Sequence, residues 1–253
     1  MMLLDVKDLT VSYGELTITD KVSFQLEEGQ WLMLIGPNGA GKTTVVRAIS
    51  QAAPYTGEVW YCGKNIKAYK PSQLAQHIGV LSQKNNVGYS FTVGEVVRMG
   101  RYAHSRHIFA PKAEEEQRIV QEAMEMTGVA PLADQSVLTL SGGELQRTFL
   151  AQLFAQNPRV LILDEPTNHL DLVYQKQVFE LIRTWLQQPG RAVISVVHDL
   201  SLARAYGTHA LLLDRARTLE YGTVEQVFAS ERLNTAYNMN VRNWMRDMLG
   251  QWE

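Results

Sequence analysis

Cysteine is almost missing from this chain, since Cys62 is the single one among 253 residues. One cysteine cannot form an internal disulfide, so no disulfide framework supports the fold. The first residues also lack the charged and apolar regions of a secretory signal peptide. Together these absences predict a protein that is not exported and that works in the reducing cytoplasm.

Long apolar runs and an excess of basic residues are absent as well. The longest apolar runs, such as Trp31–Ile35 and Ala192–Val197, have the length of a strand, far short of the roughly 20 residues that span a bilayer. Any membrane role is therefore expected to be exercised through a partner. The formal net charge is −2, which argues against a dedicated nucleic-acid binder, because such proteins carry a basic excess.

The most informative motif that is present lies at residues 36–43, where GPNGAGKT matches GxxxxGK[ST]. In this pattern small residues let consecutive backbone N–H groups wrap a phosphate chain. Lys42 reaches the terminal phosphates, Thr43 offers a hydroxyl to Mg²⁺, and a helix starting near Gly41 points its positive end at the same anion. The motif therefore predicts binding of a nucleoside triphosphate. The predicted nucleotide-binding residues are Gly36, Pro37, Asn38, Gly39, Ala40, Gly41, Lys42, Thr43 and Thr44.

The short apolar runs predict the architecture. Runs bounded by Gly, Asp or Pro are typical of strands buried on both faces, and here they alternate with helical patterns at Thr43–Ala52 and Leu172–Gln187. This alternation indicates a doubly wound α/β fold with a P-loop NTPase core. The predicted core strands are Trp31–Ile35, Val160–Leu163, Ala192–Val197 and Ala210–Leu213.

Two stretches depart from that alternation. The first thirty residues resemble antiparallel strands with turns at Tyr13-Gly14 and Glu28-Gly29, which predicts an N-terminal antiparallel β subdomain. Between about Lys84 and Pro158 the strand-like runs stop and helical periodicity takes over. We therefore expect one domain over 1–253, with a core of 1–84 and 159–253 and an inserted helical subdomain of 85–158.

Two carboxylates follow a buried strand in VLILDEPT. Ligands of open α/β sheets meet the carboxyl ends of the strands, which is where Asp164 lies. Asp164 is therefore predicted to hold Mg²⁺, and Glu165 to face the γ-phosphate and to orient or deprotonate the attacking water. The alternative is that Asp-Glu-Pro only ends a strand and caps a helix, but the P-loop upstream favours the functional interpretation.

The segment LSGGE predicts the start of a helix. Ser141 suits the N-cap, and Glu144 three residues later completes a capping box. Two consecutive glycines are costly at a helix start, and close approach of the backbone to an anion would explain them. Because the P-loop already serves this chain's own nucleotide, a second phosphate-binding helix end would serve the ATP of another copy. The segment comprises Leu140, Ser141, Gly142, Gly143 and Glu144.

Taken in order, the P-loop, LSGGE, LILDEPTNHLD and a later strand-end His198 resemble the nucleotide-binding subunit of an ABC transporter over essentially the whole chain. LSGGE is the signature motif of that family. In such proteins two subunits meet head to tail, and each ATP lies between one subunit's P-loop and the other's signature segment. The resemblance thus implies ATP and Mg²⁺ as ligands, a homodimer, and hydrolysis that requires the dimer.

The same resemblance implies roles for single residues. Tyr13 would stack on adenine, and Asp171 would lie at the dimer seam. Gln83 would sense Mg²⁺ and the γ-phosphate, and His198 would contact the γ-phosphate. Alone, each would be an ordinary surface or strand-end residue. The expected catalytic residues are Glu165, His198 and Gln83, and the expected Mg²⁺ ligands are Thr43, Gln83 and Asp164.

Three further segments look like the ATPase subunits of iron-siderophore, haem and cobalamin importers: GVLSQKNNVGYSFTVGEVVRMGRYAH, HDLSLARAYG and ASERLNTAYNMNV. This likeness implies a peripheral protein at the cytoplasmic face of the cell membrane. Its partners would be a polytopic permease of two subunits and, indirectly, a substrate-binding protein. TNHLD also occurs in the ribosome-associated class. The alternative is therefore a soluble single-cassette ABC ATPase that acts on a macromolecular complex without transport.

The segment Gln83–Arg101 is predicted to lie against a cytoplasmic helix of the permease. Its apolar anchors would be Val87, Tyr89, Phe91 and Val93. The late Trp244, Met245, Met248 and Trp252 have spacings that suit one apolar helix stripe, which is expected to pack on the core or on a dimer mate.

Other conspicuous residues are expected to be unremarkable. Glu114–Glu116 is interpreted as a solvated helix face, and Cys62 as an isolated thiol. His104 and His107 lack a carboxylate or cysteine at metal-ligand spacing, so no metal site is expected there.

Overall fold

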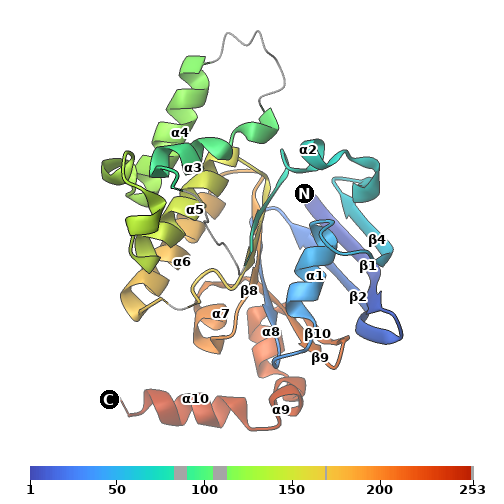
Figure 1. Ribbon diagram of the computed structural model, residues 1–253. Coiled ribbons are helices and arrows are strands. Elements are labelled where there is room, and N and C mark those ends of the chain that lie inside the picture. Colours follow the sequence, from blue (N-terminus) through green and yellow to red (C-terminus); the bar gives the residue numbers. More distant parts are fainter. Residues whose placement is uncertain (83–89, 105–112, 169, 252–253) are drawn as a thin grey trace. The chain divides into compact units, whose positions relative to one another are not determined.

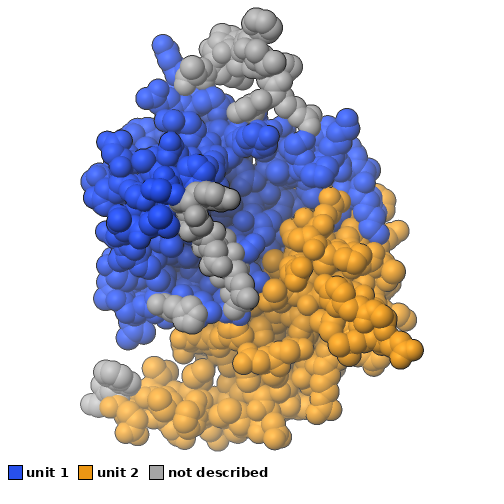
Figure 2. All heavy atoms as spheres, in the orientation of Figure 1, with its two compact units in different colours: residues 1, 27–29, 64–195 blue, residues 2–26, 30–63, 196–253 orange. Residues whose placement is uncertain are grey.

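The computed structural model describes residues 1–82, 90–104, 113–168 and 170–251. By their internal contacts the residues form two compact units, which are coloured separately in Figure 2. Unit 1 consists of Met1, Glu27–Gly29 and Lys64–Ser195, and unit 2 of Met2–Leu26, Gln30–Gly63 and Val196–Glu253. The division into a core and a helical subdomain of 85–158 stays a prediction.

Unit 2 begins with the antiparallel strands that the alternating pattern predicted. Its first sheet has the order β2-β1-β4, and β1 pairs antiparallel with β4. The turn between β1 and β2 contains Gly14, whose φ of 61° is left-handed and suits glycine. The strands are β1 (Met2–Tyr13), β2 (Leu16–Glu27) and β4 (Thr56–Tyr61).

A second set of strands in unit 2 has the order β10-β9-β3. Strand β3 (Trp31–Ile35) is wholly buried and runs parallel to β9 (His209–Asp214), which pairs antiparallel with β10 (Arg217–Thr223). Helix α7 packs against β3, and α8 packs against β9 and β10 (Figure 1). The helices of unit 2 are α1 (Lys42–Ile49), α7 (Leu200–Tyr206), α8 (Val224–Ala229), α9 (Glu231–Tyr237) and α10 (Val241–Leu249).

Helix α1 is shorter than predicted. The periodicity predicted a helix over Thr43–Ala52, but α1 ends at Ile49. Two residues later Gln51 has a φ of 60°, a left-handed conformation that cannot continue a right-handed helix. The backbone N–H groups of Ala52 and Ala53 then both return to the carbonyl of Arg47, which closes the helix end.

Unit 1 holds three core strands in the order β8-β7-β6 and the short β5 (Lys64–Asn65). Strands β6 (Ile78–Leu81) and β7 (Val160–Asp164) are parallel, with Leu81 opposite Leu163. Every residue of β7 and of β8 (Ala192–Val196) is buried, as expected for strands covered on both faces.

The described residues within 85–158 form helices and turns, with one isolated bridge between Thr92 and Ser136. Helices α3, α4 and α5 pack on one another (Figure 1). Phe154 of α5 stacks on Trp185 of α6, with ring centroids 6.1 Å apart. The helices of unit 1 are α2 (Pro71–Leu74), α3 (Val93–Met99), α4 (Ala113–Thr127), α5 (Gly142–Gln156) and α6 (Leu172–Leu186), with 3₁₀ turns at η1 (Ile66–Ala68), η2 (Tyr102–His104), η3 (Ala130–Leu132) and η4 (Val137–Thr139).

Candidate functional site

The glycine-rich loop of unit 2 connects β3 to α1. Its first glycine, Gly36, lies so close to another strand that an added Cβ would be 2.1 Å from the carbonyl oxygen of Leu213. At Gly41, which has a φ of 97°, a Cβ would lie 2.7 Å from the carbonyl oxygen of Ile18. Both positions therefore require glycine. Gly41 is the N-cap of α1 and makes no side-chain capping bond, so no side chain of the N-cap residue competes with an anion at this helix N-terminus.

Lys42 brings a positive charge into this loop. The residue is 5% exposed, and its Nζ donates hydrogen bonds to the carbonyl oxygens of Gly36 (2.7 Å) and Pro37 (2.9 Å). No acidic residue occupies the first turn of α1. The ammonium group and the helix N-terminus therefore both favour an anion at the loop.

Tyr237 is a residue of this region to which the sequence analysis assigned no role. Its hydroxyl accepts a hydrogen bond from the backbone N–H of Gly36 at 3.0 Å, although 201 residues separate the two. Burial raises the pKa of the Tyr237 phenol, and the bond from Gly36 lowers it in part. The phenol stays protonated at neutral pH. It thus braces the start of the loop from helix α9, and no local pattern announced this contact.

His198 and Tyr13, which have expected roles, both lie in unit 2. The backbone N–H of Val197 donates to the carbonyl of Leu34 in β3 at 3.3 Å, which brings the following His198 to the edge where the glycine-rich loop begins. His198 itself is exposed. Tyr13 ends β1 and is 49% exposed, so its ring is available for stacking.

Asp164 and Glu165 belong to unit 1. Asp164 ends the buried strand β7 and is only 4% exposed. Glu165 follows with a φ of 55°, an uncommon conformation for a residue with a side chain. Its Oε2 accepts a hydrogen bond from Nδ2 of Asn168 at 2.9 Å. Gln83 lies outside the described residues.

The capping box of the signature segment is confirmed. Ser141 is the N-cap of α5, its Oγ accepts from the backbone N–H of Glu144 (3.3 Å), and Oε2 of Glu144 accepts from the backbone N–H of Ser141 (2.8 Å). The Ser141 hydroxyl also donates to Oε2 of Glu144 at 2.7 Å. These bonds, the one from the hydroxyl first, lower the pKa of the Glu144 carboxyl.

The two glycines of this segment have different surroundings. A Cβ on Gly143 would lie 2.6 Å from the ring of Tyr174, so packing against α6 already requires a glycine there. A Cβ on Gly142 would find its nearest neighbour, Cδ2 of Leu170, at an ordinary 3.8 Å. The predicted explanation, close approach to an anion, is thus needed only for Gly142. Nearby, Asp171 is the N-cap of α6 and accepts from the backbone N–H of Tyr174 at 3.0 Å.

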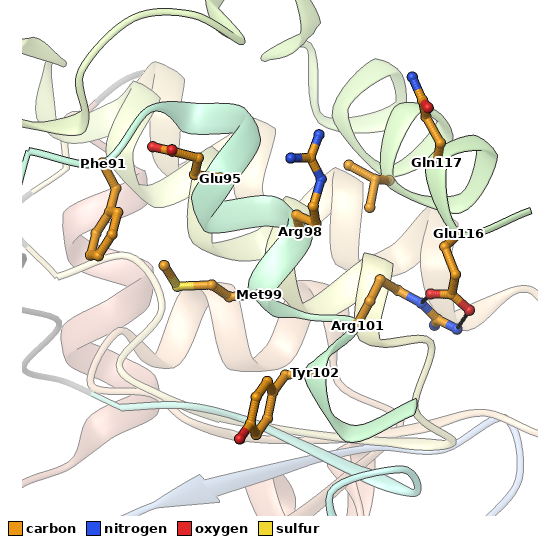
Figure 3. A pocket seen from close by; sticks show the side chains of 9 residues that line it. Phe91, Glu95, Arg98, Met99, Arg101, Tyr102, Glu116 and Gln117 are labelled. Atoms are coloured by element: carbon orange, nitrogen blue, oxygen red, sulfur yellow. Dashed lines mark hydrogen bonds and ion pairs between the residues drawn. The ribbon is translucent and has the colours of Figure 1, made fainter. Parts of the chain in front are cut away.

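A pocket of about 610 Å³ opens in unit 1 beside helices α3 and α4 (Figure 3). Its base contains Arg101, which is 7% exposed and which binds Glu116 of α4 through two hydrogen bonds, one of them 2.9 Å between Nη2 and Oε1. Met99 and Tyr102 are 42% and 86% exposed at the pocket. The lining residues are Phe91, Glu95, Arg98, Met99, Arg101, Tyr102, Glu116, Gln117 and Val120.

The pocket corrects two sequence-based expectations. Glu114 and Glu115 are exposed, as a solvated helix face predicts, but the carboxylate of Glu116 pairs with the buried guanidinium of Arg101. Val93 is wrong as an exposed anchor, since it is fully buried, whereas Phe91 does line the pocket. Val87 and Tyr89 lie outside the described residues. Charge periodicity could not reveal the Arg101–Glu116 pair, because its partners lie on different elements.

Cys62, His104 and His107 were expected to have no special role. Cys62 is a free, exposed cysteine. Nε2 of His104 donates a hydrogen bond to the carbonyl oxygen of Gln156 at 2.9 Å, and His107 lies outside the described residues. Among the side chains that the structure describes, no three His, Cys, Asp or Glu residues are grouped to hold a metal ion.

Trp244, Met245 and Met248 of the late apolar stripe lie in helix α10, and their burial is partial, while Trp252 lies outside the described residues. In α10, Trp244 is 52% exposed and Met248 is 47% exposed, while Met245 lies 3.8 Å from Oγ of Ser201 through its sulfur. Only part of the stripe therefore packs on the core. Across the described ranges, no helix combines the length and apolarity that crossing a bilayer needs.

The structure gathers the predicted residues into two groups. In unit 2 the glycine-rich loop, Lys42 and His198 lie at one edge. In unit 1 the turn at Glu165 and the start of α5 are joined by a hydrogen bond of 2.6 Å from Nε2 of Gln146 to the carbonyl oxygen of Pro166. The first group suits the binding of a phosphate chain, and the second supplies carboxylates and a second helix N-terminus.

Comparison with known proteins places these groups in context. Residues 19–168 match the ABC transporter family. An ABC transporter ATP-binding protein of Bacillus subtilis is 40% identical over 92% of this chain, which spans 53% of that relative's length. The ferric enterobactin transport ATP-binding protein of Escherichia coli is 35% identical over 92% of this chain and 86% of its own. A hemin import ATP-binding protein of Rhodococcus jostii is 37% identical over 90% of this chain and 77% of its own.

A solved ATP-binding cassette of an ABC transporter in its ADP conformation has the same fold. It superposes with a TM-score of 0.82 over 95% of this chain and 100% of its own, at 21% identity. The agreement confirms the predicted α/β fold with an antiparallel β part and helices.

Proposed function

This chain belongs to the ABC transporter family as one of its ATPases, and we propose that it drives an importer for iron-siderophore, haem or cobalamin-type compounds. It would act through a separate membrane permease. The observation that carries this proposal is the sequence identity to relatives named for ferric enterobactin, hemin and cobalamin transport. The ferric enterobactin and cobalamin relatives match more than nine tenths of this chain. The phosphate-binding loop with its buried Lys42 supports the ATPase part.

ATP would be held first by the glycine-rich loop of unit 2. The backbone N–H groups of the loop and of the start of α1 would wrap the phosphates, and Lys42 would exchange its bonds to the loop carbonyls for bonds to phosphate oxygens. Tyr13 would stack on the adenine, because its exposed ring stands at a strand end.

The oxygen donors of the chain fit Mg²⁺. Thr43 offers a hydroxyl and Asp164 a carboxylate that is almost fully buried at the end of β7, and oxygen ligands are those that this ion prefers. Bound there, Mg²⁺ would neutralise charge on the phosphates. Gln83 is the third proposed ligand.

Hydrolysis would depend on placement more than on covalent chemistry. The Glu165 carboxylate would orient or deprotonate the attacking water, and the His198 imidazole would contact the γ-phosphate. The left-handed backbone of Glu165, with its side chain held by Asn168, gives this carboxylate a defined direction. Such defined directions are a feature of catalytic groups.

A second copy of the chain is proposed as the first partner. The start of α5 would bind the ATP held by the partner's loop, and Asp171 would lie at the seam. Exposed apolar side chains surround these elements and suit burial in a dimer: Leu138 is 58%, Leu172 80% and Val173 64% exposed.

The permease is proposed to dock at the pocket beside α3 and α4. The pocket offers the apolar Phe91, Met99 and Tyr102 together with Glu95 and Arg98, a combination that suits an amphipathic helix (Figure 3). Docked in this way, the protein would lie peripherally at the cytoplasmic face of the membrane. Through the permease it would also serve a substrate-binding protein.

The experiment that tests the proposal is purification of the tagged chain from gently solubilised membranes in Mg-ATP. We expect a stoichiometric permease with several membrane spans to co-purify, and the reconstituted complex to take up an iron chelate, haem or cobalamin. Recovery with ribosomal or other cytoplasmic partners alone would overturn transport and leave the ATPase standing. Glu165→Gln should bind ATP, trap the dimer and turn over on the order of 10²–10⁴ times more slowly.

A further inference from the structure

The turn that carries Glu165 has a backbone that needs support. Glu165 has a φ of 55°, and a residue with a side chain keeps such a conformation only where its surroundings hold it. Part of the support is local: the backbone N–H of Asn168 donates to the carbonyl of Glu165 (3.2 Å), and its Nδ2 donates to the Glu165 carboxylate (2.9 Å).

Another support comes from the signature helix. Gln146 lies in the second turn of α5, and its Nε2 donates to the carbonyl oxygen of Pro166 at 2.6 Å, across 20 residues of sequence. Pro166 follows Glu165 directly. The bond therefore holds the peptide group between Pro166 and Thr167, one residue beyond the left-handed Glu165, and a shift of α5 would move that peptide group.

The neighbours of Gln146 at the start of α5 contact α6. The Arg147 guanidinium lies over the Tyr174 ring, 5.5 Å from its centroid, and donates to Gln177 at 3.1 Å. The backbone of Gly143 also packs against the Tyr174 ring. These contacts make the start of α5 and α6 a stiff pair. The Gln146 side chain, by contrast, directs its bond at the Glu165 turn.

We propose that Gln146 is a positioning residue that transmits the state of the signature helix to the chain's own catalytic carboxylate. This inference rests on the proposed function, in which α5 binds the ATP held by the partner chain. When that ATP engages the start of α5, Gln146 sets the Pro166 peptide and with it the direction of Glu165. The two ATP sites of a dimer are thereby coupled through one hydrogen bond within each chain.

The competing interpretation is that the bond only stabilises the junction between α5 and β7. The two interpretations differ in what a loss of the bond changes. A stabilising bond affects the folded population and thus ATP binding and hydrolysis alike. A positioning bond affects the rate at saturating ATP while leaving ATP binding intact, because a misdirected base slows only the chemical step.

The test uses the full chain with Gln146→Ala and the nearly isosteric Gln146→Glu, which cannot donate from a carboxylate. Gln177→Ala is the matched control, since it removes a hydrogen bond from the neighbouring Arg147 without touching the turn. Steady-state hydrolysis over a range of ATP concentrations gives kcat, KM and the Hill coefficient. ATP-induced dimerisation is measured for each change in a Glu165→Gln background.

We expect both Gln146 variants to lower kcat about 10-fold with little change in KM, and to bring the Hill coefficient toward 1. Dimer trapping should persist, and Gln177→Ala should stay within about 2-fold of the unchanged chain. Unchanged kcat, or equal losses in all three variants, would overturn the positioning role. Failure of the proposed function is distinguishable, because the unchanged chain would then show no ATP hydrolysis that depends on Lys42.

Discussion

Two helix N-termini in this molecule face an expected phosphate, and they are built in opposite ways. In unit 2, α1 starts at a left-handed Gly41 that makes no side-chain capping bond, and Lys42 is buried in the loop. In unit 1, α5 starts at Ser141, whose capping box with Glu144 occupies the N–H of Glu144 and places a carboxylate in the first turn. The start of α1 therefore favours an anion, whereas the start of α5 already carries the Glu144 carboxylate.

This difference teaches which end can bind phosphate by itself. At α1 the helix dipole and the ammonium group act together on an anion. At α5 the Glu144 carboxylate opposes an incoming phosphate. We therefore expect the signature segment to act only when another chain presents an ATP whose charge is already neutralised by that chain's Lys42.

The largest effect is expected when the α1 end loses its cation. Lys42→Ala should weaken ATP binding by a single chain on the order of 10 to 100-fold, because charge-assisted bonds to phosphate are lost. Equilibrium binding of a fluorescent ATP analogue measures this. The control is Lys67→Ala, which removes an exposed lysine from the 3₁₀ turn η1. An unchanged affinity for ATP in Lys42→Ala would contradict the claim that the start of α1 binds phosphate by itself.

Mixing two inactive variants sharpens the comparison. Ser141→Arg should leave ATP binding by the single chain intact and abolish hydrolysis, since it obstructs the α5 end alone. A mixture of Ser141→Arg and Lys42→Ala chains should hydrolyse ATP, because a mixed head-to-tail dimer retains one intact pair of ends. Phosphate release from the mixture and from each variant measures this. Activity no higher than in either variant alone would contradict ATP sites that are shared between two chains.

Variants at the two glycines of α5 distinguish the effect of helix packing from the effect of ligand contact. Gly143→Ala should destabilise the fold by about 1–3 kcal/mol, because the new Cβ meets the Tyr174 ring. Gly142→Ala should change the free energy of unfolding by no more than about 0.5 kcal/mol, yet lower hydrolysis if phosphate approaches its backbone. Denaturant unfolding and ATPase assays of both variants measure this. Full activity in Gly142→Ala would remove the anion argument for that residue.

The smallest expected effect is a dependence of local stability on pH at the start of α5, which the start of α1 should not show. The pKa of Glu144 is lowered in the folded chain by its bonds to Ser141, so the capping box adds stability above the ordinary pKa of a glutamate. That contribution is lost as the pH falls through the lowered pKa. We therefore measure hydrogen exchange and correct each rate for the intrinsic pH dependence of amide exchange. In acid, the protection of the first α5 amides should then fall more than the protection of the first α1 amides. The same change in Ser141→Ala would contradict the assignment.

Local chemistry is what the sequence predicted well. The Ser141–Glu144 capping box, the α1 start and the turn at Gly14 depend on residues within three or four positions of one another. Contacts between distant segments were not predictable. Nothing near Tyr237 indicates that its hydroxyl receives the Gly36 N–H, and the run Glu114–Glu116 conceals the one carboxylate that pairs with buried Arg101.

The motifs by themselves determined the family and the α/β fold class with its glycine-rich loop before a helix, because these depend on residue types at fixed short spacings. Only the tertiary structure decided why Gly143 must be glycine, that Val93 is buried, and that Gln146 reaches Pro166. Those facts depend on contacts between two helices, or between a helix and the end of a strand. Such contacts are determined by the packing of a whole unit, and residues that are neighbours along the chain do not encode them.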